Sequence, residues 1–380
     1  MHILIISWRD IKNPSSGGAE VLTHESAKRL VRWGEEVTLI APRFPTACRS
    51  ETVDGVKTLR PTYFYPTSFT TYLRWPTFLA SVVKTYRVLQ DQIDVVIDQV
   101  HGLPSLTALY VDKPVILFPH EVAQEIWFAQ VPFPGNVIGW VTERAYLRLF
   151  RGFPFIANSP STERDLKRFG IQRVKTITQG TAEPPKTLPP KTKHPHFILL
   201  GRVTQMKRLG DAISAFAILK QYHPESKLTI VGKGSKGYGE ELKRKTQALG
   251  LKESVSFTGF VSEPEKFKLL AQSWALLSTS LREGWGLVIS EAASVGTPTV
   301  AYAVPGVVDA VLDTTTGLLT STNNPSELAK KMRQLVEERD LRTRLSRQAK
   351  VHARKFSWDV SAKQFLAAIE SYLNEAPMKP

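Results

Sequence analysis

Short apolar runs rich in β-branched residues alternate along the chain with longer stretches in which apolar positions recur every three or four residues. The runs at 3–7, 36–41, 95–98, 115–119 and 155–158 predict buried strands. The stretches at 19–34 and 78–90 predict helices that each present one apolar face. Strands that alternate with helices in this way form a parallel sheet covered by helices.

A stretch rich in proline and lysine, residues 183–195, interrupts this alternation. Its five prolines rule out a regular element, because each lacks a backbone N–H and fixes φ. We interpret the stretch as a linker between domains. The alternation then restarts, with strands expected at 196–200, 227–231, 255–258, 275–279 and 299–302 and helices at 210–222 and 239–249.

The predicted architecture is α/β, with two doubly wound parallel-sheet domains that face each other across a cleft. The first domain is expected to span residues 1–185 and the second residues 186–355. In 356–380 we expect a last helix that crosses back to the first domain. A length of 380 residues fits two or three domains, at ~150 residues each.

The composition indicates the cellular compartment in which the protein is expected. Hydrophobic residues make up 42% of the chain, but no apolar run reaches the ~20 residues that a membrane-spanning helix needs. The apolar run at 1–7 is short and leads straight into a turn, which is unlike a signal peptide. Cys48 is the only cysteine, which excludes an intrachain disulfide and a cysteine metal cluster. We therefore expect a cytoplasmic protein.

The formal net charge is +15, and most of the excess lies after residue 185. Such a bias attracts anions, whether nucleotides, nucleic acid or an acidic membrane surface. Neither a zinc-finger spacing nor the aromatic signature of an RNA-binding domain accompanies the charge. We therefore do not expect nucleic acid as a partner.

The segment from Glu283 to Glu291 carries the strongest chemical signal. The two glutamates are separated by a glycine-rich turn at 284–286 that opens a helix. Backbone amides at a helix start bind phosphate, and a flanking carboxylate can hold hydroxyls. A nucleotide sugar, which carries phosphates between two polyols, fits this pattern. The alternative is a pair of glutamates on a solvated helix face.

Basic residues and a second pair of glycines also follow predicted strands. Arg202 and Lys207 come after the strand at 196–200, and ligands of doubly wound sheets bind at the carboxyl ends of strands. Arginine offers phosphate a planar fork and lysine a point charge, so the pair could neutralise a diphosphate without a metal. Gly17 and Gly18 join the first strand to the first helix and form another candidate anion cradle. The alternatives are solvated surface charges and an ordinary turn.

One further motif matches the dinucleotide-binding fingerprint: Gly232-Lys233-Gly234-Ser235-Lys236-Gly237. That fingerprint also requires an acidic residue at the end of the next strand, ~20 residues on. The next predicted strand ends in Gly259-Phe260-Val261, without an acid. A nicotinamide-dependent enzyme is therefore not favoured.

Taken together, these motifs resemble those of the retaining nucleotide-sugar glycosyltransferases of family 4 (group 1), which have the GT-B fold. The resemblance covers nearly the whole chain. Trp285 departs from the family, which often has phenylalanine there, but it retains an aromatic ring. The segments that carry the resemblance are Gly17-Gly18, Phe118-Pro119-His120-Glu121, Ala157-Asn158-Ser159, Gly201-Arg202 with Lys207, Val231-Gly232-Lys233-Gly234, Thr258-Gly259-Phe260-Val261, the pair Glu283/Glu291 and Phe356-Ser357-Trp358.

The resemblance implies a role for each matching residue on the donor side. Arg202 and Lys207 would hold the donor diphosphate, with Gly17 and Gly18 on its other side. Glu283 would lie against the donor sugar, Glu291 would bind the ribose hydroxyls, and the backbone near Val261 would meet the base. The donor-binding positions are then Gly17, Gly18, Gly232, Val261, Gly284, Trp285, Gly286, Leu287 and Glu291.

His120 matches the active-site histidine of the family and would lie near the reacting carbon. The implied catalytic residues are therefore His120, Arg202, Lys207 and Glu283. An unperturbed imidazole titrates near neutrality and could polarise the sugar or the acceptor hydroxyl. His101 is a second candidate on a similar strand-end loop. Without the resemblance, a hydrogen-bonded histidine at a strand end is the ordinary interpretation.

The implied reaction moves a hexose from a UDP- or GDP-sugar to a hydroxyl of a glycan or lipid-linked acceptor, with no metal and no cofactor. Retention without an enzymic nucleophile favours a front-face path, in which the acceptor attacks from the side that the diphosphate leaves. Fixed cations and a helix start would stabilise the developing charge. Two alternatives stay open: a nucleotide-sugar epimerase on the same fold, and a non-catalytic nucleotide-sugar-binding protein.

The first domain also combines aromatic and basic residues. A basic amphipathic helix with aromatic residues can lie on an anionic membrane surface. Peripheral contact with the cytoplasmic membrane face is therefore one expectation, and a core-facing helix with a solvated arginine face is the alternative. The residues concerned are Tyr63, Phe64, Tyr65, Tyr72, Arg74, Trp75, Trp127, Phe128, Trp140, Arg144, Tyr146, Arg148, Phe150 and Arg151.

Overall fold

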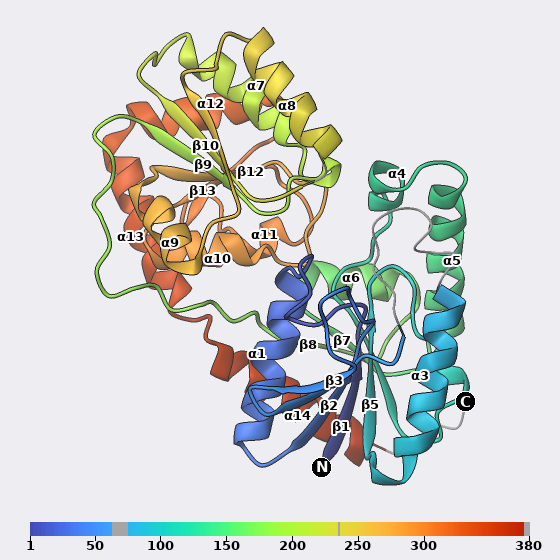
Figure 1. Cartoon of the computed structure of the whole chain (residues 1–380). Coiled ribbons are helices and arrows are strands. Elements are labelled where there is room, and N and C mark those ends of the chain that lie inside the picture. The colour runs from blue at the N-terminus through green and yellow to red at the C-terminus, as the bar shows by residue number, and fades with distance from the viewer. Residues whose placement is uncertain (63–74, 235, 376–380) are drawn as a thin grey trace. The chain divides into compact units, whose positions relative to one another are not determined.

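The computed structural model describes residues 1–62, 75–234 and 236–375 (Figure 1). The chain divides into two units. Unit 1 contains Met1–Gly180 together with the chain from Trp358 onward, and unit 2 contains Thr181–Ser357.

The unit 1 sheet has its most apolar strand in the interior. Residues 3–6 of β1 (His2–Ile6) are apolar and fully buried, as expected for a strand covered on both faces. Among the described residues the strand order is β3-β4-β2-β1-β5-β6-β7-β8, with β3 antiparallel to β4 and every other pair parallel. The other strands are β2 (Glu36–Ile40), β3 (Ser50–Val53), β4 (Val56–Leu59), β5 (Val95–Val100), β6 (Val115–Pro119), β7 (Phe155–Ala157) and β8 (Val174–Thr176).

Helices pack on the unit 1 sheet through their apolar sides. In α3, for example, Phe78, Val82 and Tyr86 recur at helical spacing and are buried in the same core cluster as Leu4. The described helices of the unit are α1 (Gly18–Arg32), α3 (Trp75–Leu89), α4 (Ile126–Gln130), α5 (Gly135–Leu149), α6 (Pro160–Arg168) and α14 (Trp358–Asn374), with short 3₁₀ turns at η1 (Gln90–Gln92) and η2 (Thr107–Leu109).

The helix α14 returns to unit 1 and packs beside α1 (Figure 1). Its Phe365 ring lies 5.8 Å from the ring of Phe118 on β6, and the Tyr372 hydroxyl donates a hydrogen bond to the Phe155 carbonyl at 3.0 Å. Gly180, where the chain leaves the unit, has no room for a side chain, because a Cβ there would lie 2.2 Å from the ring of Trp358. The helix is therefore an integral part of the N-terminal unit.

Unit 2 has a parallel sheet in the order β11-β10-β9-β12-β13-β14. Its strands are β9 (His196–Leu200), β10 (Lys227–Val231), β11 (Val255–Gly259), β12 (Ala275–Ser278), β13 (Thr299–Ala301) and β14 (Gly317–Leu319). Its described helices are η3 (Gln205–Lys207), α7 (Leu209–Lys220), α8 (Lys236–Ala248), α9 (Glu263–Gln272), α10 (Leu287–Ser294), α11 (Val307–Ala310), α12 (Pro325–Glu337) and α13 (Arg339–Ala353).

The prediction of two doubly wound α/β units is confirmed, and each strand predicted from an apolar run is present. The strands β3, β4, β8 and β14 were not predicted; β3 and β8 contain no buried residue and so form no apolar run. The units divide after Gly180, earlier than the expected 185, because the proline-rich stretch packs onto unit 2. There the Lys191 ammonium donates to the Ser273 carbonyl at 2.6 Å, and Leu188 packs against the core.

Candidate functional site

Two strand-end loops of unit 2 bring Lys207 to Glu283. Lys207 ends the turn η3 after β9, Glu283 follows β12, and the two side chains form an ion pair. The Ser280 hydroxyl donates to the same Glu283 oxygen at 2.6 Å, and the Thr279 hydroxyl donates to the Lys207 carbonyl at 2.7 Å. These bonds hold a carboxylate and an ammonium together at the carboxyl edge of the sheet, the position where such folds bind ligands.

The turn between Glu283 and α10 depends on close backbone packing. The Glu283 N–H donates to the Pro305 carbonyl at 3.0 Å, and a Cβ on Gly306 would lie 2.0 Å from the Glu283 carbonyl oxygen. Gly286 has φ of +88°, a conformation that favours glycine, and precedes the first helical residue, Leu287. The Ile289 N–H donates to the Gly286 carbonyl at 2.8 Å, so the amides of Leu287 and Val288 are those at the start of α10 that can bind an anion.

Trp285 turns away from this edge. Its side chain is buried, its Nε1–H donates to the Ser290 hydroxyl at 2.9 Å, and its ring lies 5.2 Å from that of Phe356. The buried side chain of Trp285 therefore anchors the turn before α10 to the core of unit 2. Its backbone, like that of the neighbouring Gly284, is the part that stands in the turn.

Glu291 lies one turn further along α10 and pairs with a lysine that the sequence did not suggest. Lys266 on α9 places its ammonium 2.8 Å from Glu291 on α10 and 2.8 Å from Glu263. Burial raises the pKa of the Glu291 carboxyl, and the positive charge of Lys266 partly offsets that effect. A lysine three residues after a glutamate is common on helices, where the two usually pair with each other. The position of Lys266 after Glu263 therefore did not indicate a further partner on another helix.

The loop with Arg202 is pressed against the loop after β10. A Cβ on Gly232 would lie 1.8 Å from the Gly201 carbonyl oxygen, and one on Gly234 would lie 2.0 Å from the Val203 carbonyl oxygen. The glycines of the dinucleotide-like motif thus serve close backbone packing. Arg202 lies exposed on the surface of this loop.

Val261 follows β11 and packs partly buried against the core of unit 2. The ring of the preceding residue, Phe260, is 72% exposed, and the Lys233 ammonium lies 5.2 Å from its centre. An exposed aromatic face with a cation beside it is suited to a planar, electron-rich ring. The structure thus places a surface of this kind next to the predicted base-binding backbone.

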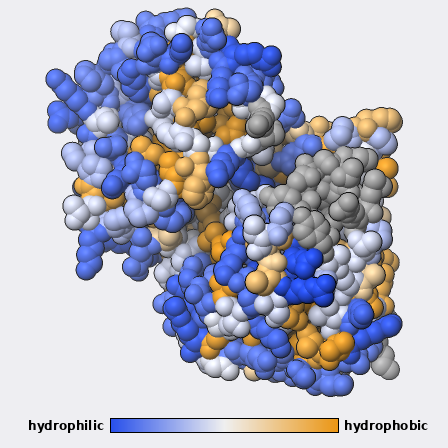
Figure 2. Space-filling view, viewed as in Figure 1, coloured by the Kyte–Doolittle hydropathy of each residue, from blue (hydrophilic) through white to orange (hydrophobic). Residues whose placement is uncertain are grey.

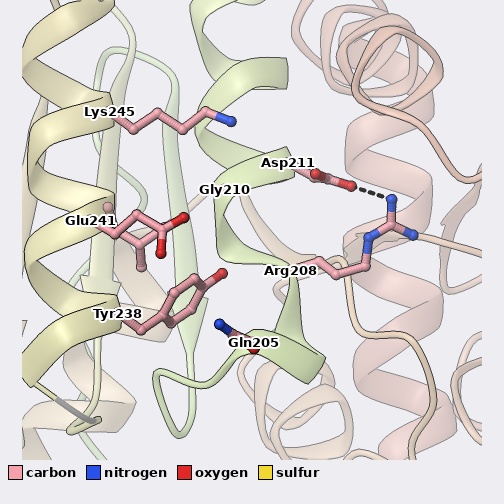
Figure 3. A pocket seen from close by; sticks show the side chains of 8 residues that line it. Gln205, Arg208, Gly210, Asp211, Tyr238, Glu241 and Lys245 are labelled. Carbon is pink, nitrogen blue, oxygen red and sulfur yellow. Dashed lines mark ion pairs between the residues drawn. The ribbon is translucent and has the colours of Figure 1, made fainter. Parts of the chain in front are cut away.

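A separate pocket of ≈310 Å³ opens between α7 and α8 (Figure 3). Tyr238, Glu241 and Lys245 reach into it from α8, whereas the side chains of Arg208 and Asp211, at the start of α7, point away from α8 (Figure 3). Arg208 and Asp211 form an ion pair with each other at 2.5 Å. None of its lining residues belongs to a motif recognised in the sequence, although Gln205 and Arg208 lie close to Lys207 in the chain.

In unit 1, Gly17 and Gly18 form the start of α1, and the carboxylate of Glu20 organises it. The Gly17 N–H donates to Glu20 Oε2 at 2.6 Å, and Arg9 Nε donates to Glu20 Oε1 at 2.9 Å. Burial opposes ionisation, but Arg9, His101 and the Gly17 N–H together lower the pKa of Glu20 to about 2. The two glycines were predicted from the sequence as functional residues, whereas Arg9 and Glu20 were not.

His120 lies at the end of β6 and is buried. Its ring centre is 4.8 Å from that of His101 and 4.6 Å from that of Phe118. Within the described part of the chain neither ring nitrogen of His120 has a hydrogen-bond partner. Burial, reinforced by His101, holds the pKa of His120 well below its usual range, so the imidazole is neutral. The two predicted histidines are therefore in contact.

Glu143 on α5 anchors the loop that follows His120. Its buried carboxylate accepts hydrogen bonds from the backbone N–H groups of Ala123 at 2.6 Å and Gln124 at 2.8 Å, and from Trp127 Nε1 at 3.3 Å. Burial raises the pKa of Glu143, and these donors counteract the rise. The loop next to His120 is therefore attached to α5.

The outer side of α4 and α5 is apolar, but of the aromatic residues that the sequence suggested on these helices only Phe128 is exposed. Tyr146, Phe150 and Trp127 are buried, and Arg144 stacks 3.6 Å above the ring of Trp140. Those aromatic residues belong to the core and to a local cation–π pair, which corrects the expectation that they face outward together. The large apolar side chains exposed here are Phe128, Phe133, Val137, Ile138, Val141 and Leu149, and hydrophobic surface is visible over these helices (Figure 2).

Two groups of the predicted aromatic and basic residues, 63–65 and 72–74, lie outside the described residues. Among the helices that the structure does describe, none is both long and apolar enough to span a membrane.

Two family models match the chain. The model described as glycosyltransferase family 4 matches residues 16–181, and the model described as glycosyl transferases group 1 matches residues 181–352. Among curated proteins, a D-inositol 3-phosphate glycosyltransferase of Streptomyces coelicolor is 32% identical over 187 residues. That match covers 46% of this chain and 41% of the relative, so the chain spans less than half the length of that protein.

Solved structures resemble the chain over nearly its whole length. Sucrose-phosphate synthase from Thermosynechococcus elongatus has a TM-score of 0.79 at 20% identity, covering 97% of this chain and 98% of that one. The Anabaena protein HepE, solved in complex with UDP and glucose, has a TM-score of 0.74 at 21% identity, covering 98% and 100%. At such identities the likeness shows the fold, which is GT-B with two Rossmann-like parallel-sheet domains.

Proposed function

The chain belongs to the group 1 glycosyltransferases of family 4, and from this premise we propose that it transfers a hexose from a nucleoside-diphosphate sugar to an acceptor hydroxyl with retention of configuration. The observation that carries the proposal is the ion pair of Lys207 and Glu283 beside the start of α10. Cation, carboxylate and helix amides, here those of Leu287 and Val288, are the three groups that a diphosphate joined to a sugar requires.

On the donor side, Lys207 and Arg202 neutralise the leaving diphosphate together with the first amides of α10, and no metal is needed. Glu283 binds hydroxyls of the transferred sugar. Glu291, held by Lys266, binds the ribose. Positioned charges of this kind stabilise the charge that develops on the leaving group.

The engagement of Glu283 supports the front-face path. One of its carboxylate oxygens is occupied by Lys207 and by the Ser280 hydroxyl. Both contacts withdraw electron density, and a carboxylate that is bound in this way is a weak nucleophile. The acceptor oxygen therefore attacks from the side that the diphosphate leaves, while the neutral ring of His120 polarises the acceptor hydroxyl.

The acceptor is a glycan or lipid-linked molecule reached at the cytoplasmic membrane face. Support comes from the apolar outer side of α5, where Val137, Ile138 and Val141 are exposed and Arg148 lies beside Leu149. Exposed apolar side chains next to arginines are suited to the headgroup region of an anionic bilayer. The comparisons do not favour the epimerase or the non-catalytic alternative.

Release of nucleoside diphosphate is the measurement that tests the transferase. We would incubate the full chain with UDP-glucose first, because HepE binds UDP and glucose, then with other UDP- and GDP-hexoses, each with EDTA and with lipid-linked or glycan acceptors. The expected result is diphosphate release that depends on acceptor, persists in EDTA and yields an α-linked product from an α-configured donor by NMR.

Other outcomes have distinct meanings. A product of unchanged mass without diphosphate release would identify an epimerase. A donor that raises the thermal unfolding temperature but is never consumed under any acceptor condition would favour a binding protein. Activity that EDTA abolishes and Mg²⁺ restores would overturn the metal-independent site.

A further inference from the structure

Arg208, which directly follows Lys207, has an unfavourable backbone conformation. Its φ is +47° and its ψ is +40°, in the left-handed region that residues with a side chain seldom occupy. The residue ends the turn η3 and precedes α7, so its conformation sets the direction in which the turn with Lys207 meets the helix. Strained conformations of this kind persist only where the surroundings hold them.

The side chain of Arg208 is held by two groups that also bind each other. Its Nη2 lies 2.5 Å from Asp211 Oδ2 (Figure 3), and its guanidinium carbon lies 5.1 Å from the centre of the Tyr302 ring. The Tyr302 hydroxyl donates to the same Asp211 oxygen at 3.0 Å. Burial and the Asp211 charge raise the pKa of Tyr302, so its hydroxyl stays protonated and remains a donor.

Tyr302 attaches this arrangement to the sheet of unit 2. It is fully buried directly after β13, and its N–H donates to the Ser278 carbonyl, at the end of β12, at 2.9 Å. At the other end of the turn, the Met206 carbonyl accepts from the Leu281 N–H, in the loop after β12, at 2.8 Å. Lys207 therefore lies between two attachments to neighbouring strand ends.

We propose that Arg208, Asp211 and Tyr302 are positioning residues for the transfer reaction. They hold the turn η3 in the conformation in which the Lys207 ammonium pairs with Glu283 and meets the donor diphosphate. The inference rests on the proposed function. A cation stabilises the leaving group best when it is fixed in place before the bond breaks, because its reorientation would otherwise add to the barrier.

Tyr302→Phe is the first variant, because it removes one hydroxyl and keeps the ring beside the guanidinium. Its kcat for nucleoside diphosphate release is measured with Lys207 present and in the Lys207→Ala background. With Lys207 present, kcat should fall by ~10-fold to ~10²-fold, as for a small misplacement of a catalytic group. In Lys207→Ala it should change by less than ~2-fold, since no ammonium is left to position.

Tyr222→Phe is the matched control. Tyr222 is 56% exposed in unit 2, so the loss of its hydroxyl should leave kcat unchanged. If Tyr302→Phe lowers kcat equally in both backgrounds, the proposal is overturned, because Tyr302 would then act on the fold of unit 2 and not through Lys207.

Arg208→Gly covers the case in which Tyr302→Phe does not fold. Glycine adopts the left-handed conformation readily, so the backbone keeps its course while the side-chain anchor is lost. The fall in kcat should again occur with Lys207 present and be absent in Lys207→Ala. A fall that persists in Lys207→Ala overturns the proposal, because it would show that the guanidinium itself binds the diphosphate.

Hydrogen exchange of the turn provides a measurement that needs no substrate. The Arg208 N–H donates to the Gln205 carbonyl at 3.0 Å, and the Lys207 N–H donates to the Thr204 carbonyl at 3.1 Å. In Tyr302→Phe both amides should exchange at least ~10-fold faster than in the wild type, while the strands of unit 2 keep their rates. Unchanged exchange at the turn overturns the inference, whether or not the chain is a transferase. Faster exchange in a chain that releases no diphosphate from any donor would overturn the proposed function alone.

Discussion

Lys266 and Glu291 meet between helices α9 and α10, with the ammonium nitrogen 2.8 Å from a carboxylate oxygen. Only 11% and 13% of their side-chain surfaces are exposed, so the pair is largely withdrawn from water. A ribose bound by Glu291 would hydrogen-bond a carboxylate that Lys266 already orients. The pair should therefore matter for stability and for donor binding.

Removing one partner of this pair should be more harmful than removing both. Lys266→Met leaves the Glu291 charge without its partner and should lower the free energy of unfolding by about 3–5 kcal/mol. Adding Glu291→Leu should recover most of that loss, because a packed apolar pair can replace a buried ion pair. Urea unfolding of the single and double variants measures both values. A double variant less stable than Lys266→Met would contradict this account, and neither variant should bind donor normally.

Arg202→Ala and Lys207→Ala should each reduce turnover by ~10²–10³-fold, the usual effect of removing one positioned donor that stabilises transition-state charge. The fold should persist in both, since each residue lies on a strand-end loop. The assay is nucleoside diphosphate release at saturating donor. Lys243→Ala, which removes an exposed lysine on α8, is the control for a general charge effect. Wild-type turnover in either loop variant would exclude the assigned role.

The two ends of the dinucleotide-like motif should respond oppositely to alanine. Gly232 has φ of +139° and no space for a Cβ, so Gly232→Ala should destabilise unit 2 by at least ~1–3 kcal/mol. Gly237 lies in α8 with nothing within 4 Å of an added Cβ, so Gly237→Ala should stabilise by ~0.5–1 kcal/mol. Thermal unfolding tests both. Equal effects would mean that the glycines do not serve backbone packing.

Lys191 should make stability depend on pH in the alkaline range. Burial lowers its pKa to about 7 in the folded protein, whereas an unfolded lysine keeps the ordinary value of 10.5. Between those two values the unfolded chain binds more protons, so stability should rise with pH there. Lys191→Met removes this contribution. Urea unfolding at several pH values between 7 and 10 should therefore give a shallower rise for the variant, and identical slopes would refute the prediction.

The outer side of α5 should bind anionic vesicles. The wild-type chain should float with phosphatidylglycerol vesicles at low salt and less at high salt, because part of the attraction is electrostatic. Ile138→Asp should weaken the binding, since it places a charge in the apolar surface. Val351→Asp on α13 is the matched control, because Val351 is 50% exposed but lies in unit 2. Failure of the wild type to float at low salt would end this proposal.

The strands and the donor-side loops could be predicted from the sequence because they depend on local pattern and on one general rule. Apolar runs marked the strands, and the rule that ligands bind at strand carboxyl ends placed Lys207 and Glu283 on one edge. The partners of Glu291 and Glu20 could not be predicted in the same way. Lys266 and Arg9 reach them from other elements, and such pairs are set by tertiary packing.

Side-chain direction was the other limit. Aromatic residues are common in binding surfaces, yet the aromatic side chains of Trp285, Tyr146 and Phe150 are all buried in the cores of the units. The sequence around an aromatic residue that neighbours a glycine or an arginine does not show whether the ring faces a ligand, lipid or the protein core. Only the position of the neighbouring elements decides between them.

Because the chain returns to unit 1 at Trp358, the two units complete their folding in a fixed order during synthesis on the ribosome. Synthesis proceeds at ~5–20 residues per second, so α14 emerges roughly ten seconds or more after the rest of unit 1. Until then Phe118 lacks the ring of Phe365 that packs on it. Unit 2 is contiguous and can complete its core as soon as it is made. The N-terminal half of the polypeptide is therefore the later half to reach its native state, which makes it the part that depends most on protection during translation.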